Sequence, residues 1–366
     1  MDERERYAWL QLALTPYVGA ESFLRLLRHY GSASAALGAD ADEVARLACN
    51  GKQAAKGWAQ TDKARAAADA ALEWARQSGC RLLLLCDDDY PPLLGEGLTP
   101  PPLLFVRGDA GLLARPAVAV VGSRHATPQA VRIAGEFAQA LSGRGITVVS
   151  GMASGIDAAA HGGALDGIGR TVAVWGTGID RVYPPANRAL AHQIAERGAV
   201  VSEFPLGTKP VAGNFPRRNR IIAALARAVL VVEAALASGS LITARLAAEM
   251  GREVMAVPGS IDNPHSKGCH QLIKQGAKLT ETIDDIVQEC PALSAAAPPV
   301  RAAPPPQQRP AEPHGPLLAA LGYDPFHPDA LAERLGMAAD EVYAQLLELE
   351  LSGRIAALSG GRFQRV

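Results

Sequence analysis

An aromatic residue and three arginines fall within seven positions of this chain, in a combination that could bind nucleic acid. Residues 214–222 have the sequence Asn-Phe-Pro-Arg-Arg-Asn-Arg-Ile-Ile, and a lysine adds positive charge just upstream. Guanidinium groups can bind backbone phosphates, and an aromatic ring can stack on a base. The candidate residues are Lys209, Phe215, Arg218, Asn219 and Arg220. These residue types favour a single-stranded nucleic acid as the ligand.

Gly122-Ser123-Arg124 is a second candidate phosphate site, at the end of a β-branched apolar run. A dinucleotide-binding fingerprint would place Gly-x-Gly-x-x-Gly at this point, and the sequence lacks it. A single glycine opens the turn instead, and Arg124 can bind a phosphate through two hydrogen bonds. We therefore expect phosphate contacts here.

Ser238, Gly239 and Ser240 precede a helical pattern and have two interpretations. The backbone N–H groups at a helix N-terminus can bind an anion. The same serines can equally cap the helix without any ligand. The sequence leaves both interpretations open.

Two other groups of polar residues could do chemistry, and the sequence favours a catalytic or metal role for neither. Asp157 and His161 are four residues apart, so one helical face could carry a carboxylate–imidazole pair. However, no serine or cysteine nucleophile is placed to use that pair. Three aspartates follow one another at residues 87–89, but no histidine or glutamate lies at ligand spacing, so a solvated loop is the better interpretation.

Short apolar runs that alternate with helical segments predict the sheet that positions these residues. Such runs, each ending in small residues before a helical pattern, are typical of a parallel α/β sheet. The carboxyl ends of its strands form a crevice where a phosphate-bearing ligand can bind. The strands predicted for this parallel sheet are Ala117–Val121, Thr147–Ser150, Thr171–Trp175, Ala199–Ser202, Val229–Val232 and Glu253–Val257. Two further strand candidates, Arg81–Cys86 and Leu103–Arg107, precede them.

The segments that flank this sheet predict further domains. Residues 1–78 have helical periodicity around a Val18-Gly19 turn, as in a helix-hairpin-helix or sterile-alpha-motif-like (SAM-like) bundle. The sheet domain would span 79–290, and a linker rich in proline and alanine would span 291–315. Residues 316–366 have a helix-turn-helix and hairpin pattern, which predicts a winged-helix-like domain.

Positive charge is concentrated in the predicted sheet domain. Residues 115–274 contain 17 Lys/Arg and 10 Asp/Glu, a net charge of +7, whereas residues 1–80 contain 10 of each. Residues 315–366 contain 4 basic and 7 acidic residues, a net charge of −3. A polyanion therefore fits the sheet domain best. The neutral N-terminal bundle favours packing over DNA binding, and the acidic tail favours packing or protein contact over binding in the major groove.

The remaining composition predicts a cytoplasmic protein. The chain has 5 cysteines and no Cys-x-x-Cys pair, so neither a disulfide framework nor a zinc site is expected. The charged N-terminus is unlike a secretory signal, and no apolar run is long enough to span a bilayer. We therefore expect no membrane association.

Six motifs in order resemble those of the DNA-processing protein A family (DprA, also called Smf). They are Gly122-Ser-Arg124, Ser150-Gly-x-Ala-x-Gly-Ile-Asp157, Ser202-Glu-Phe-Pro205, Phe215-Pro-x-Arg-Asn-Arg-Ile-Ile222, Ser238-Gly-Ser-Leu-Ile-Thr-Ala244 and Val257-Pro-Gly259. The resemblance implies an α/β fold in which an extended Rossmann-like domain lies between the SAM-like and winged-helix-like modules. It also implies a homodimer that binds single-stranded DNA and loads a RecA-type recombinase during natural transformation. Single-strand-binding protein is a further candidate partner, and no enzymatic activity, metal or cofactor is implied.

The resemblance also assigns roles to individual residues. Arg124 matches the DNA-contacting arginine of the Gly-Ser-Arg motif. A second DNA-contacting motif contains Phe215, Arg218, Asn219 and Arg220, and Lys209 is the expected basic partner of that motif from the loop before it. The residues expected to contact single-stranded DNA are Gly122, Ser123, Arg124, Lys209, Phe215, Arg218, Asn219, Arg220, Ser238, Gly239, Ser240 and Lys274. One departure is Cys269-His270, which stands where relatives often have Gly-Thr-Asn after the glycine at 268.

An enzyme is the alternative class. Nucleotide phosphoribohydrolases with similar Rossmann-like sheets have a Pro-Gly-Gly-x-Gly-Thr loop. The corresponding loop here, residues 238–243, has the sequence Ser-Gly-Ser-Leu-Ile-Thr and lacks that glycine run. The sequence therefore favours the DNA-binding hypothesis.

Overall fold

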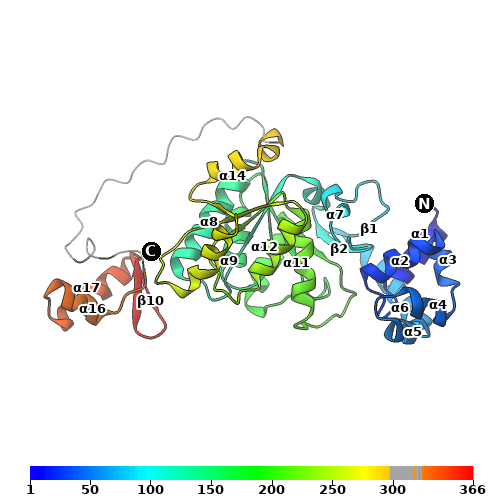
Figure 1. Cartoon of the computed structure of the whole chain (residues 1–366), viewed down its shortest axis with the longest axis horizontal. Helices are drawn as coiled ribbons and strands as arrows, with labels where there is room; N and C mark the ends of the chain where they lie inside the picture. Colours follow the sequence, from blue (N-terminus) through cyan, green and yellow to red (C-terminus); the bar gives the residue numbers. More distant parts are fainter. Residues whose placement is uncertain (297–316, 318–320, 322–323, 366) are drawn as a thin grey trace.

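A nine-stranded mixed sheet forms the centre of the computed structural model, which describes residues 1–296, 317, 321 and 324–365 (Figure 1). The strand order is β1-β2-β6-β5-β4-β3-β7-β8-β9. The seven strands from β6 to β9 in that order are parallel neighbours, β2 is antiparallel to β6, and β1 is antiparallel to β2. The predicted parallel α/β sheet is confirmed.

The observed strands match the predicted apolar runs to within two residues at either end. Strands β3 to β7 are buried along their whole length, which explains why their sequences are continuously apolar rather than alternating. The bounds are β1 Cys80–Leu84, β2 Leu103–Gly108, β3 Ala117–Val121, β4 Thr147–Ser150, β5 Thr171–Val174, β6 Ala199–Ser202, β7 Ala228–Val231, β8 Glu253–Ala256 and β9 Lys278–Leu279. The short, exposed β9 was not predicted.

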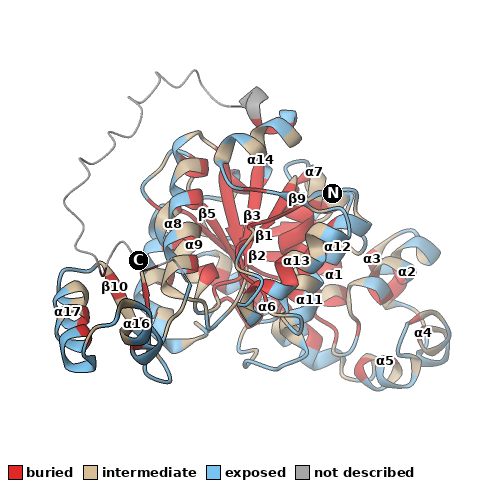
Figure 2. Ribbon diagram, turned by 60° about the vertical axis from the view of Figure 1, so that its left-hand side comes forward, coloured by how far each residue is buried: buried red, intermediate tan, exposed pale blue. Residues whose placement is uncertain are grey.

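Helices cover both faces of the sheet and bury its strands between them (Figure 2). Helices α8 and α9 pack on one face together with α14, while α11, α12 and α13 pack on the other. The bounds are α7 Pro92–Gly95, α8 Pro128–Gly143, α9 Ile156–Ala164, α10 Arg188–Arg197, α11 Asn214–Leu225, α12 Ser240–Glu249, α13 Lys267–Lys274 and α14 Ile283–Glu289. The chain therefore winds both ways from β3, and the strand order reverses between β3 and β7.

The N-terminal residues form a helical bundle joined to the antiparallel edge of the sheet. Trp9 Nε1 donates to Pro102 O at 2.8 Å, and the Trp74 ring contacts that of Phe105 on β2, with centroids 5.4 Å apart. Asp87, which the sequence placed in a solvated loop, pairs with Arg6 at 2.5 Å. The bounds are α1 Glu3–Ala13, α2 Ala20–Tyr30, α3 Ala33–Leu37, α4 Ala41–Leu47, α5 Gly51–Trp58 and α6 Thr61–Ala75.

A small winged-helix domain follows the sheet domain. It comprises α16 Pro328–Leu335, α17 Ala339–Leu351, β10 Ile355–Leu358 and β11 Arg362–Arg365, with Leu331, Val342 and Leu346 in its core. Most of the predicted linker, 297–315, lies outside the described residues. Its first six residues form a 3-10 turn, and Leu293 in that turn is buried in the core beneath α14.

Among the described helices, none combines the length and the apolar character needed to cross a membrane.

Candidate nucleic-acid interface

The candidate site lies where the strand order reverses, between the carboxyl ends of β3 and β7. The Gly122-Ser123-Arg124 loop follows β3, and the loop that leads to α12 follows β7. The backbone joins the two loops, because Ser123 N donates to Glu233 O at 2.7 Å. A β-carbon at Gly122 would lie 2.8 Å from the same oxygen, so this position needs glycine. Ligands of doubly wound sheets bind at such a point.

An open groove of about 760 Å³ occupies this switch point, which we call the switch-point groove. Its wall contains a half-buried aromatic ring, an exposed arginine and the beginning of α12. Nine of the twelve sequence-predicted residues line it: Gly122, Ser123, Arg124, Phe215, Arg218, Asn219, Ser238, Gly239 and Ser240. The structure therefore brings most of the predicted DNA-contacting residues into one groove, from the loop after β3, helix α11 and the beginning of α12.

Arg124, Phe215 and Tyr183 form the aromatic part of the groove. The Arg124 guanidinium carbon lies 5.6 Å from the centre of the Phe215 ring, and the Tyr183 ring centre lies 5.5 Å from it. Phe215 is in the first turn of α11, where the following proline is tolerated because the N–H it lacks has no helical partner there. A β-carbon at Gly176 would lie 2.8 Å from Phe215 Cδ1, so the glycine after β5 makes room for the ring.

Arg218 lies beneath the groove surface and is only 4% exposed. Its Nη1 donates to Gly151 O at 2.5 Å and to Val174 O, so it joins the loop after β4 to the end of β5. Burial lowers the pKa of Arg218 to about 10, while nearby Asp157 acts in the opposite direction. This side chain thus has a structural role that the sequence did not indicate.

Asp157 and His161 also hold the scaffold together. Asp157 Oδ2 accepts from Gly151 N at 3.1 Å and from Ala153 N at 3.2 Å. Burial raises the pKa of Asp157, against the opposite effects of Arg218 and these two amides. His161 is fully buried, and burial lowers its pKa to about 3. Asp157 therefore positions the loop after β4. His161 contacts Thr171 at the start of β5 instead, and it is not exposed to the groove.

The Ser238-Gly239-Ser240 segment begins α12, as the sequence predicted. The Ser238 and Ser240 hydroxyl oxygens lie 2.7 Å apart, and Ser240 N donates to Ser238 Oγ at 3.3 Å. Asn219 Nδ2 donates to Gly239 O at 3.4 Å, which connects α11 to this helix start. Local capping and a position on the groove wall coexist, so the structure accommodates both interpretations of the serines.

Three predicted residues lie outside the groove. Arg220 pairs with Glu203 and faces a depression between the N-terminal bundle and the sheet domain. Lys274 lies on α13 beside an apolar hollow that also includes Ile261 and Leu279. Lys209 is exposed in the loop before α11, next to Pro210, which does line the groove. These three residues therefore do not line the switch-point groove, and their contact with single-stranded DNA stays a prediction.

The structure adds groove residues that the sequence analysis missed: Tyr183, His125 and His265. Tyr183 follows the Gly176-Thr-Gly178 loop at the end of β5. Its position shortly after the end of a predicted strand could have indicated that it lies near the groove. His125 directly follows Arg124. Nothing in the sequence around His265 indicated that its loop returns to the β7 end.

The fold and this groove define a Rossmann-like α/β protein of the kind that binds a phosphate-bearing ligand at the carboxyl ends of its strands. Comparison with protein families is consistent with that class. The model described as DNA recombination-mediator protein A matches residues 81–291, that of a DprA-like N-terminal HHH domain matches 3–70, and that of the DprA winged helix domain matches 301–361. The chain belongs to the DNA recombination-mediator protein A (DprA/Smf) family.

Individual relatives agree with this membership. Protein Smf of Escherichia coli is 45% identical over 301 residues, which cover 81% of this chain and 80% of that protein. The X-ray structure of DNA processing protein A from Streptococcus pneumoniae is 38% identical with a TM-score of 0.66, covering 79% of this chain and 98% of that one. A structure of the Helicobacter pylori protein, whose description concerns its single-stranded DNA binding mode, is 29% identical with a TM-score of 0.53, covering 58% of this chain and 96% of that one.

Proposed function

We propose that this chain binds single-stranded DNA in the switch-point groove. The observation that carries the proposal is the position of Phe215, which is half-buried and contacts both the Arg124 guanidinium and the Tyr183 ring. An aromatic face can stack on any base, and an adjacent exposed arginine can bind a backbone phosphate. The described binding mode of the Helicobacter pylori relative supports the same ligand.

The contacts in the groove suit a ligand of any sequence. Arg124 offers charge to phosphate, and the start of α12 offers backbone N–H groups. Backbone contacts position a nucleic acid without identifying its bases. The net charge of +7 over residues 115–274 attracts a polyanion to this domain.

We further propose that the bound strand is presented to a RecA-type recombinase during natural transformation. The family description, recombination mediator, supports such a role. Single-strand-binding protein would be a competing or contacting partner on the same DNA. The protein would act in the cytoplasm.

A homodimer would align two grooves on one strand. Exposed apolar side chains near the edge strand β9 support this arrangement, because Leu236, Ile261 and Leu279 are 62%, 73% and 45% exposed. An edge strand with exposed apolar neighbours can pair with or pack against a second copy. Light scattering at micromolar concentration tests the proposed homodimer. A monomeric mass at that concentration would exclude it.

We propose no catalytic step for the groove. Of the pair considered as acid and base, Asp157 accepts from two backbone amides and His161 is fully buried. The phosphoribohydrolase alternative gains no specific support from this geometry. Cleavage of a nucleoside monophosphate by the purified protein would restore it.

A salt titration of binding to a fluorescent oligothymidylate tests the proposed function. A duplex of equal length and a nucleoside monophosphate serve as comparisons. The log-log slope for a single strand is about −0.7 per phosphate neutralised, so a slope near −3 would indicate roughly four phosphates. Equal affinity for the oligonucleotide and the monophosphate would contradict the proposal.

Loading is tested separately, by following recombinase assembly on DNA already covered by single-strand-binding protein. Addition of this protein should shorten the lag before assembly. An unchanged lag, with DNA binding intact, would exclude loading while leaving the groove assignment in place.

A further inference from the structure

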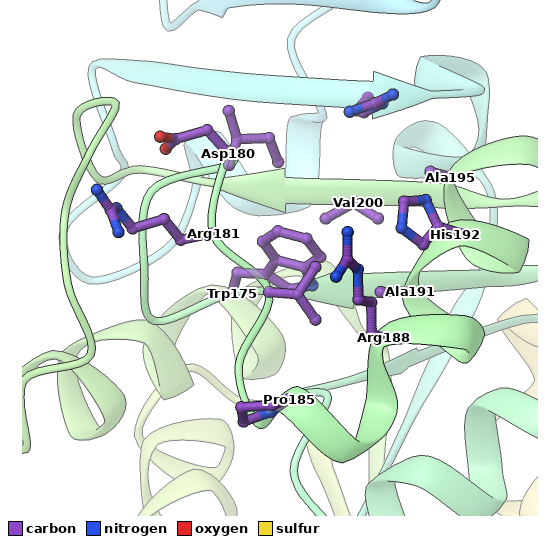
Figure 3. Close-up of a pocket in the computed structure, with 12 residues that line it drawn as sticks. Trp175, Asp180, Arg181, Pro185, Arg188, Ala191, His192, Ala195 and Val200 are labelled. Carbon is purple, nitrogen blue, oxygen red and sulfur yellow. The ribbon is translucent and has the colours of Figure 1, made fainter.

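A second basic pocket lies between the loop after β5 and helix α10 (Figure 3). Its volume is about 440 Å³, and β2, the loop after β5 and one face of α10 line it. Arg188, Ala191, His192 and Ala195 of α10 repeat at helical spacing, so they all face the same side. We call it the Trp175 pocket after the indole at its centre.

The charge of the Trp175 pocket is strongly positive. Arg107, Arg181 and Arg188 line it together with His192, and Asp180 supplies the one carboxylate. That carboxylate already accepts from Gly207 N at 2.9 and 3.0 Å. Within the described part of the chain, none of these three arginine side chains makes an ion pair or a hydrogen bond. All three are exposed, so their guanidinium groups are free to bind an anion.

Trp175 provides an independent indication of a ligand. The side chain is only 6% exposed, and its Nε1 is buried without a hydrogen-bond partner among the described residues. Buried indole N–H groups usually have an acceptor, and an unmet donor costs free energy. Figure 3 shows Trp175 and Arg188 at the centre of the pocket, with Asp180 and Arg181 on one side and His192 on the other. An anionic oxygen would suit both groups.

The pocket and the switch-point groove share one loop. Tyr183 lines the groove, while Arg181, Val182 and Pro185 line the Trp175 pocket. This loop is held in place, since Thr177 Oγ1 donates to Arg181 O at 2.6 Å and Gly178 N donates to Thr208 O at 3.1 Å. Because the two sites share this loop, a DNA strand that leaves the groove past Tyr183 can continue toward the pocket.

We propose that the Trp175 pocket binds the phosphate of a nucleotide unit. Arg188 and Arg107 provide the charge, Trp175 provides an aromatic face and an N–H donor, and His192 completes the basic rim. The phosphate can belong to the strand held in the groove, which rests on the proposed function, or to a free nucleotide. Both sources would place the same phosphate group in the pocket. Oligonucleotide binding detects the first source, and titration with a free phosphate compound detects the second.

The test compares Arg188→Ser with Arg197→Ser in the full-length protein. Both variants remove one positive charge from α10, but Arg197 pairs with Asp166 and does not line the pocket. Binding is measured with oligothymidylates of about 4 and about 12 nucleotides, lengths within the range that single-strand sites cover. If the strand fills the pocket, Arg188→Ser weakens binding of the longer oligonucleotide roughly 3- to 10-fold and makes its salt slope shallower by about 0.7, while the shorter one is unaffected.

A second arm detects a free ligand. Thymidine monophosphate or inorganic phosphate is titrated against the intrinsic fluorescence of the wild type and of Trp175→Phe. A saturable change in the wild type that is absent in both Trp175→Phe and Arg188→Ser would identify a free phosphate compound as the source. The proposal that the Trp175 pocket binds phosphate would be overturned by two results together. Arg188→Ser would not change the affinity for the longer oligonucleotide, and the wild-type fluorescence would not change on titration. If the wild-type protein did not bind the shorter oligonucleotide, the proposed DNA binding in the switch-point groove would be contradicted instead. Failure of the pocket proposal and failure of the proposed function therefore give different results.

Discussion

The guanidinium of Arg124 lies over the ring of Phe215, with 5.6 Å between its central carbon and the ring centre. The two residues are 91 positions apart in sequence. Arg124 is in the loop after β3 and Phe215 is in the first turn of α11, yet both line the groove. When no DNA is bound, this cation–π contact can keep the Arg124 side chain extended over the Phe215 ring. A phosphate and a base arriving together would find both groups already positioned.

Replacing Arg124 with alanine should weaken single-strand binding without changing stability. The side chain is exposed, so its removal leaves no buried group unpaired. The loss should be uniform across oligonucleotide sequences, and the salt slope should become shallower by about 0.7. Arg132→Ala on α8 is the matched control, because that exposed arginine pairs with Glu136 outside the groove. A loss confined to one DNA sequence would argue against a phosphate contact.

Replacing Phe215 with alanine should cost about 1–3 kcal/mol of binding, the usual contribution of one stacked base. Phe215→Tyr should retain most of the affinity, because it retains the aromatic face. Affinities from fluorescence anisotropy would separate the two variants. Unchanged affinity in Phe215→Ala would mean that no base stacks on this ring.

Gly176→Ala should displace the Phe215 ring without changing that residue. The added β-carbon would meet Phe215 Cδ1 at 2.8 Å, so the ring must move. We expect weaker single-strand binding with Arg124 and Phe215 both still present. Gly162→Ala on α9, where an added β-carbon meets nothing within 4 Å, controls for the glycine substitution itself. Unchanged affinity would show that the precise ring position is unimportant.

Arg218→Ala should act mainly on stability, in contrast to Arg124→Ala. The variant leaves the carbonyls of Gly151 and Val174 without their donor and Asp157 without its neighbouring charge. Removing one partner from a buried charged pair costs about 3–5 kcal/mol, which corresponds to a fall in Tm on the order of 10 °C. Thermal unfolding measures this directly. A variant with wild-type Tm and weak DNA binding would show that Arg218 contacts the strand.

The strands and the position of the groove could be predicted because their physical signals are local. Runs such as Ala117–Val121 are apolar on both faces, and glycines such as Gly122 mark the strand ends where backbones approach closely. The two-residue strand β9 has no such signal, since both of its residues are exposed. Its pairing depends on the sheet already being present.

The arginines of α11 show why the site was only partly predictable. Successive helical residues turn by 100°, so Arg218 and Arg220 cannot share a face, whereas Phe215, Arg218, Asn219 and Ile222 recur at spacings of three and four. The four latter residues line the groove, and Arg220 faces the opposite side toward Glu203. The helical period was therefore available from the sequence. The burial of Arg218 was not, because it depends on the carbonyl groups of Gly151 and Val174, which are distant in sequence.

His161 should make the protein less stable as the pH falls. Thr171 Oγ1 donates to Val148 O and therefore accepts from His161 Nδ1 at 2.7 Å, which leaves Nε2 as a buried acceptor without a partner among the described residues. Burial lowers the folded-state pKa to about 3, whereas the unfolded value is 6.5. Between these values the unfolded state binds the extra proton, so stability is full above pH 6.5 and declines below it by up to about 1.4 kcal/mol per pH unit.

His161→Asn should remove this part of the pH dependence. Asparagine can still donate to Thr171 Oγ1 but does not titrate in this window. Asp157, whose folded pKa is raised, contributes the opposite slope, and it is present in both proteins and cancels in the comparison. Denaturant midpoints at about pH 6.5, 5.5 and 4.5 should fall more steeply for the wild type than for the variant, while His29→Asn, an exposed site in the N-terminal bundle, should follow the wild type. Parallel declines in wild type and His161→Asn would mean that the imidazole becomes protonated inside the fold.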